Sequence, residues 1–127
     1  MALTVEGKVS EPFGPSLQEW TSDFSKGREE RLRFILETLG LPHAPPMIRY
    51  QLLHRMASAV IEADRFRARS AVMIVHSFSR ENRWFEDFKE FVALFEKNAE
   101  IDHLCMLQEV RGVNLFAGWA QGKKSGL

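Results

Sequence analysis

Residues 70–79 read SAVMIVHSFS, and this stretch decides the fold. Within it, Ala71 to Val75 is an unbroken apolar run of β-prone residues, which predicts a central strand buried on both faces of a sheet. Strands of this kind are typical of proteins in which helices cover a sheet. The segments on either side of this strand must therefore supply the helices and the remaining strands.

Three helices are predicted before the central strand. They cover residues 15–24, 29–39 and 47–66, where apolar residues recur at intervals of three and four. Gly27 is expected to break the first helix, and Gly40 is the expected C-cap of the second. The third helix is the longest, and its predicted apolar side consists of Ile48, Leu52, Met56, Ala59, Val60 and Ala63.

The rest of the chain completes the predicted layers. A strand at 2–9 opens the chain, and a helix at 83–97 follows the central strand. Two further strands, between 104 and 120, meet at a tight turn near Arg111 and Gly112. The order is strand, three helices, strand, helix, strand, strand. We therefore expect an α/β (α+β) fold with a mixed sheet of about four strands covered by helices.

Composition places the chain among ordinary globular proteins. Its 127 residues suit one domain, 1–127, with a frayed tail at 120–127. The 17 basic and 17 acidic residues give a formal net charge of +0, which argues against a strongly basic nucleic-acid binder. The chain has one cysteine, no signal segment and no apolar run near the roughly 18 residues of a membrane span. These features predict a cytoplasmic protein without membrane association.

The strand expected at 2–9 carries Glu6 and Lys8, two positions apart. Side chains alternate along a strand, so these two share a face and set a carboxylate beside an ammonium group. With a second carboxylate nearby, such a pair can hold Mg²⁺ and orient a water whose pKa the metal lowers. The alternative is a salt-bridged pair on a solvent-facing side of the sheet.

A strand with Glu-x-Lys, followed by helices and an apolar strand, resembles the active-site core of the PD-(D/E)XK (restriction-endonuclease-like) superfamily. Over roughly residues 3–120 the chain also looks similar to a bacterial family with this fold, of which it would be a shortened member. The similar stretches are VEGKVSEPFG, IRYQLLHRMASAVIEA, AVMIVHSFS and WFEDF. The resemblance implies a trimmed nuclease-like core. In it, Glu6 would be the metal carboxylate and Lys8 the catalytic lysine, with Gln51 and Tyr50 facing the site.

The chain departs from that superfamily at one point. The superfamily has an Asp on the strand before the Glu-x-Lys strand, whereas Met1 stands only five residues before Glu6, too few for such a strand. Glu11 could supply the second carboxylate only if the chain bends at Ser10, because positions 6 and 11 differ by an odd number. A lone carboxylate binds Mg²⁺ poorly. We therefore expect no cofactor, or Mg²⁺ if the protein is an active nuclease.

Two other groups of residues are candidates for function. His76 closes the central strand, where it is either an accessory to the site or an anchor for the following loop. Arg65, Arg67 and Arg69 alternate just before that strand, so an extended segment would place them on one side as a rim for nucleic acid. The alternative for the arginines is a solvated loop paired with the acidic residues just before them.

Three functions follow from these observations. The first is a non-catalytic or degenerate nuclease-fold protein that acts by binding a macromolecule, for example as an inhibitor from a phage or mobile element. The second is a Mg²⁺-dependent nuclease that completes its site with a carboxylate from another chain or an upstream segment. The third is a homo-oligomeric structural subunit that dimerises through the open edge of its N-terminal strand. The sequence favours the first, with a protein partner and without enzymatic activity.

Overall fold

A computed structural model describes residues 2–8, 14–21, 26–77 and 84–121 of the chain. Within these ranges the helices and strands follow one another in the predicted order. Their bounds are β1 Ala2–Lys8, α1 Leu17–Thr21, α2 Lys26–Leu39, α3 Tyr50–Arg65, β2 Ser70–Ser77, α4 Phe85–Ala93, β3 Leu104–Val110 and β4 Val113–Gln121.

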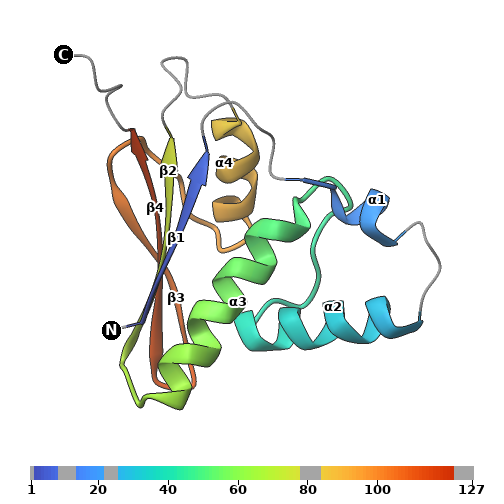
Figure 1. The fold of residues 1–127 in the computed structure, drawn as a ribbon, viewed down its shortest axis with the longest axis horizontal. Coiled ribbons are helices and arrows are strands. Elements are labelled where there is room, and N and C mark those ends of the chain that lie inside the picture. The colour runs from blue at the N-terminus through green and yellow to red at the C-terminus, as the bar shows by residue number, and fades with distance from the viewer. Residues whose placement is uncertain (1, 9–13, 22–25, 78–83, 122–127) are drawn as a thin grey trace.

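The four strands form one mixed sheet in the order β1-β2-β4-β3. β1, β2 and β4 are parallel, and β3 pairs antiparallel with β4. β2 has a neighbouring strand on each side, as its apolar sequence predicts. Figure 1 shows the helices on one side of the sheet. The prediction of an α/β fold with a mixed sheet of four strands and covering helices is confirmed. β4 continues to Gln121, so the predicted tail begins too early, and residues 122–127 lie outside the described residues.

The two faces of the sheet differ in burial. On the helix-covered face, alternate residues of β2 and β4 are buried: Ala71, Met73, Val75, Leu115, Ala117 and Trp119. On the other face Ile74 and Phe116 are half-buried, and Leu104 and Met106 are 55% and 45% exposed. The expectation that β2 is buried on both faces therefore holds fully on the helix side and only in part on the other, where no described helix lies.

The helices bury the predicted residues but begin and end differently. Every residue of the predicted apolar side of the third helix is buried. α3 nevertheless starts at Tyr50 and not at 47, because Arg49 still has extended backbone, with ψ at 122°. α2 begins at Lys26, so Gly27 lies within its first turn and does not separate it from the preceding segment. α4 ends at Ala93, four residues before the predicted end at 97.

The described helices are too short and too polar to cross a lipid bilayer. α3, the longest of them, has 16 residues and includes Arg55, Glu62 and Asp64. A membrane-spanning helix needs about 20 predominantly apolar residues.

Gly40 directly follows α2 and packs against β3. Its backbone conformation and the space around it favour glycine. Its φ is +74°, and a Cβ there would lie 2.9 Å from Nε2 of Gln108 and 3.1 Å from Cγ2 of Val110. The Gln108 amide donates to the Leu39 carbonyl at 2.5 Å, so it has little room to move away. We expect Gly40→Ala to lower the free energy of unfolding by about 1–3 kcal/mol in urea denaturation.

Gly112, in the turn between β3 and β4, is the matched control for Gly40. Its φ is +83°, but a Cβ at this position would meet no atom of another segment within 4 Å, so Gly112→Ala introduces backbone strain without a clash. The loss for Gly40→Ala should therefore exceed the loss for Gly112→Ala. Equal losses would show that the contact with Gln108 contributes nothing.

Candidate functional site

Three parallel strands end on the same side of the molecule. β1, β2 and β4 finish at Lys8, Ser77 and Gln121, and the register pairs Lys8 with Ser77 and Ser77 with Gln121. The first turns of α3 and α4 lie toward this side as well (Figure 1). We call this region the carboxyl edge: the ends of these three strands together with the starts of the two helices. In open α/β sheets ligands bind beyond the carboxyl ends of the strands.

Glu6 and Lys8 occupy neighbouring positions on one face of β1, at the carboxyl edge. Glu6 is in register with Val75, and Lys8 with Ser77. Val75 and Ser77 are both buried on the helix-covered face. Alternation along the strand therefore assigns positions 6 and 8 to that same face, as the spacing predicts. Their side chains lie outside the described part of the structure, and so does all of Glu11.

Gln51 and Tyr50, the two helix residues that the resemblance assigns to the site, have different surroundings. Gln51 is in the first turn of α3, and its Oε1 is buried without a hydrogen-bond partner. The Tyr50 ring stacks on Trp20 of α1, with centroids 4.0 Å apart, and lies 5.7 Å from His54. Tyr50 thus packs α1 against α3, and Gln51 is the one of the pair with an unused polar atom.

Arg49, directly before α3, connects three segments at this edge. Its guanidinium donates to the Gly14 carbonyl at 3.0 Å and lies 3.7 Å from the Glu19 carboxylate. Its Nε is 3.4 Å from Oδ2 of Asp87 on α4, yet without hydrogen-bond geometry. The arginine therefore holds α1 and α4 near the start of α3 while keeping one buried N–H unused.

Trp84, directly before α4, has an unusual backbone and an unpaired indole. Its φ is +71°, in the left-handed region that bulky residues rarely adopt. Its Nε1 is buried without a hydrogen-bond partner. Strained backbone of this kind concentrates at functional sites.

All the buried side-chain nitrogen and oxygen atoms that have no hydrogen-bond partner in the described part of the chain are at the carboxyl edge: Arg49 Nε, Gln51 Oε1 and Trp84 Nε1. Native proteins leave few such atoms without a hydrogen bond, so this cluster needs a partner, either water or another molecule. Two of the atoms carry N–H donors and one is an acceptor. Both Arg49 and Trp84 stand within stretches that carry the resemblance, but the sequence assigned neither of them to the site around Glu6 and Lys8.

Glu19 makes the start of α1 sensitive to pH. Ser16 N donates to the Glu19 carboxylate at 3.0 Å, and Glu19 N donates to Ser16 Oγ at 3.3 Å, which is a capping box at the start of α1. The hydrogen bond from the Ser16 backbone, followed by the one from its side chain, holds the pKa of Glu19 below its usual value. A lowered folded-state pKa means that the stabilisation is present above the unfolded-state pKa and is lost as the pH falls through the lowered one.

We therefore expect the amides of residues 16–19 to exchange faster as the pH falls below the ordinary carboxyl range, once intrinsic exchange rates are corrected for. NMR-detected hydrogen exchange across a pH series measures this. Glu19→Gln is the control, because its amide does not titrate. A wild-type profile that follows the Glu19→Gln profile at every pH would contradict the assignment.

A magnesium site would need more ligands than the described residues bring together. No group of three or more His, Cys, Asp or Glu side chains that could hold a metal ion exists among them. Asp87, a carboxylate at the carboxyl edge, is engaged by Arg49. Mg²⁺ requires several oxygen ligands in near-octahedral geometry. The described His, Cys, Asp and Glu side chains therefore form no ready-made Mg²⁺ cluster.

The other predicted candidates lie away from positions 6 and 8. His76 is half-buried and in register with Gly7, so it falls on the face opposite to Glu6 and Lys8. Arg65, Arg67 and Arg69 lie where β2 begins, at the opposite end of the sheet from its carboxyl edge. They do not form an extended segment either, because Arg65 ends α3 and Arg67 has φ at +56°. They therefore cannot form a rim around Glu6 and Lys8.

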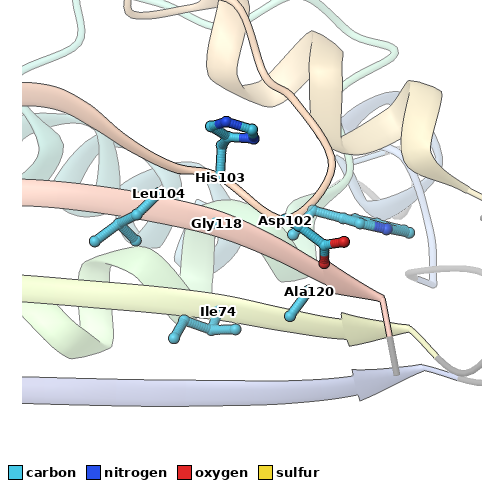
Figure 2. A pocket seen from close by; sticks show the side chains of 7 residues that line it. Ile74, Asp102, His103, Leu104, Gly118 and Ala120 are labelled. Carbon is cyan, nitrogen blue, oxygen red and sulfur yellow. The ribbon is translucent and has the colours of Figure 1, made fainter. Parts of the chain in front are cut away.

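A hollow lies on the uncovered face of the sheet, near the end of β4. It encloses about 200 Å³, and Figure 2 shows Ile74, Leu104 and Ala120 among its lining residues. Its polar residues already serve the local structure. Asp102 accepts from Gln121 N at 2.8 Å, and His103 Nδ1 lies 3.0 Å from the Ile101 carbonyl. Because these groups fasten the loop before β3 to β4, the hollow offers less chemistry than the carboxyl edge.

Comparison with known proteins identifies the family of the chain. Neither the curated proteins nor the solved structures contain a match. The model of one protein family, described as Domain of unknown function (DUF6946), matches residues 1–124. The match covers nearly all of the 127 residues. The chain therefore belongs to the DUF6946 family.

Proposed function

We propose that this chain acts by binding a partner protein, which adds a strand to the free edge of β1. The observation that carries the proposal is the position of β1: it stands first in the sheet order and pairs with β2 alone among the described strands. An edge strand of seven residues offers a row of backbone N–H and C=O groups to another strand. In this proposal the protein is a cytoplasmic binding module, of which an inhibitor is one form.

The unpaired atoms of the carboxyl edge support a polypeptide partner. Arg49 Nε and Trp84 Nε1 need an acceptor, whereas Gln51 Oε1 needs a donor. A peptide group supplies both a carbonyl acceptor and an N–H donor. A phosphodiester supplies only acceptors and would leave Gln51 unpaired. The neutral net charge also favours a protein over a nucleic acid as partner.

The partner is either a second copy of the chain or a different protein, and one set of measurements separates the two. Sedimentation velocity across a hundredfold concentration range detects self-association. Capture from the native host, followed by cross-linking and mass spectrometry, detects another partner. In both cases we expect cross-links from Lys8. A monomer at every concentration, together with a captured partner whose cross-links avoid residues 2–8, would overturn the proposal.

A second candidate is a metal-dependent nuclease of the PD-(D/E)XK type, favoured by the positions of Glu6 and Lys8. They share the helix-covered face of β1 at the carboxyl edge, where that superfamily holds its site. A strand added beside β1 would also bring its own side chains next to Glu6. Such a strand could supply the second carboxylate that Mg²⁺ requires. Mg²⁺ would supply a water of lowered pKa, and Lys8 would orient that water.

Nucleic-acid cleavage with Mg²⁺ or Mn²⁺ tests the second candidate. Supercoiled plasmid, single-stranded DNA and RNA are the substrates, and the chain is assayed alone and with its captured partner. A nuclease should lose at least about a hundredfold in rate in Glu6→Ala and in Lys8→Ala, since each removes a group that acts on the reacting atoms. Glu109→Ala, at an exposed carboxylate of β3, is the matched control. Cleavage that is equal in Glu6→Ala and the control excludes this candidate.

A further inference from the structure

A groove at the opposite end of the sheet from the carboxyl edge is lined by apolar residues. It lies between α2, α3 and the turn that joins β3 to β4, and it encloses about 230 Å³. Val60 and Val113 are buried in its floor. Phe34 of α2 and Ile61 of α3 line it while 55% and 45% exposed.

A further exposed aromatic residue follows α3, five residues after Ile61. Phe66, directly after α3, is 70% exposed, the largest exposed fraction among the large hydrophobic residues of the described chain. Phe34, Ile61 and Phe66 make up half of the six large hydrophobics that are exposed there. Single exposed apolar residues are ordinary, but a group of them beside a groove is typical of an interaction site.

One arginine lines the groove, and a second follows a lining residue of α3. Arg111 lines it, and Arg65 stands one helical turn after Ile61 on α3. The guanidinium of Arg65 lies over the Phe66 ring, 5.7 Å from its centroid. Arg65, Arg67 and Arg111 are exposed, and none forms an ion pair with a described residue.

The predicted pairing of the arginines with Glu62 and Asp64 is not formed among the described residues. The lining holds one acidic residue, Asp64, and one basic residue, Arg111, and Arg65 adds a second positive charge one helical turn after Ile61. The positive charge at the groove is therefore available to a bound molecule.

We propose that this groove binds an acidic amphipathic helix of a partner protein. The apolar side of that helix would lie on Phe34, Ile61 and the valine floor, and its carboxylates would face Arg65, Arg67 and Arg111. Helices bind grooves in this way through apolar residues at positions i, i+3, i+4 and i+7. Exposed aromatic residues and arginines are the residues that carry most of the binding energy at protein interfaces.

The charges and the floor of the groove favour an acidic peptide over nucleic acid. A phosphate chain would leave the apolar floor unused. An acidic helix uses both the floor and the guanidinium groups, which form bidentate bonds with carboxylates. The groove lies at the end of the sheet where β2 begins, so this inference does not depend on strand addition at β1.

Selection from a random peptide library displayed on phage tests the inference with the full chain as bait. We expect enrichment of sequences with Asp or Glu on one side of a helix and apolar residues on the other. Synthetic copies should bind Ile61→Glu and Arg111→Glu at least about tenfold more weakly than wild type. Leu104→Glu, at an exposed residue of the uncovered sheet face, should bind them like wild type.

Charge reversal distinguishes a direct contact from a folding defect. A selected peptide with its acidic residues replaced by lysine should bind Arg111→Glu more tightly than it binds wild type. Circular dichroism and thermal unfolding establish that each variant is folded. Three results would overturn the inference: no enrichment over bait-free resin, enriched peptides that bind Ile61→Glu equally well, or peptides without acidic residues. Binding of oligo(dT) that Arg111→Glu abolishes, without peptide binding, would assign the groove to nucleic acid instead.

Discussion

Trp119→Ala is expected to lower the free energy of unfolding by about 3–5 kcal/mol, the range for removing a buried aromatic side chain. Trp119 is 1% exposed and faces the helices from β4. Its ring lies 5.2 Å from Phe85 and 5.6 Å from Phe88, measured between centroids, so it packs the start of α4 onto the sheet. A domain of this size is typically stable by about 5–15 kcal/mol, and the loss is a large share of that.

Phe116→Ala is the matched control for this prediction, because Phe116 is on the same strand but on the uncovered face. It is half-buried, so its removal should cost roughly half as much as that of Trp119, in proportion to the apolar area involved. Urea unfolding followed by circular dichroism measures both variants. Equal losses would mean that the two faces are equally covered, contrary to a sheet with helices on one side.

Proline substitutions in β1 should separate the stability of the sheet from partner binding. Along a strand, adjacent residues direct their N–H groups to opposite sides, so of Thr4 and Val5 one faces β2 and the other faces the free edge. Proline facing β2 removes a ladder hydrogen bond and should cost about 1–3 kcal/mol of stability. Proline facing the free edge should leave stability nearly unchanged and weaken partner binding by at least about tenfold.

Both variants are needed, because each is the control for the other. Thermal unfolding identifies the one that leaves the ladder with β2 intact, and sedimentation or surface plasmon resonance then measures its affinity for the partner. If that variant binds the partner like wild type, the free edge of β1 is not the binding surface. Loss of binding in the destabilised variant alone would carry no weight, since unfolding explains it.

Local periodicity was sufficient to predict most of the fold. The run Ala71 to Val75 is apolar at every position and β-prone, which favours a central strand of a sheet. The apolar side of α3 follows a clear helical spacing, which is why all its members are buried. The turn at Arg111 and Gly112 was also predictable, because glycine favours the positive φ that such a tight turn requires. Both residues have positive φ in the structure.

The one-sided covering of the sheet was not predictable in the same way. Residues that face away from the helices, such as Ile74 and Phe116, are as apolar as those that face them. An apolar pattern shows that a position prefers burial, not which element or partner covers it. Leu104 and Met106 are examples: both are apolar, and both are exposed in the structure.

The carboxyl edge was predictable only where a motif exists. Glu6 and Lys8 follow a strand period, so their shared face could be stated from the spacing. Arg49 acts through contacts with Gly14 and Asp87, which are far away in the sequence and which no local pattern encodes. The alternation of Arg65, Arg67 and Arg69 predicted one side only if the segment were extended, and the structure instead has Arg65 at the end of α3 and Arg67 with φ at +56°.

Amide hydrogen exchange of residues 2–8, in the free protein and in its isolated complex, tests the central claim most directly. If a partner strand pairs with β1, the amides that face the free edge should exchange at least about tenfold more slowly in the complex, since each gains a hydrogen bond. The amides that face β2 should change less. Unchanged exchange throughout β1, with protection appearing on another surface, would contradict strand addition as the way this protein binds.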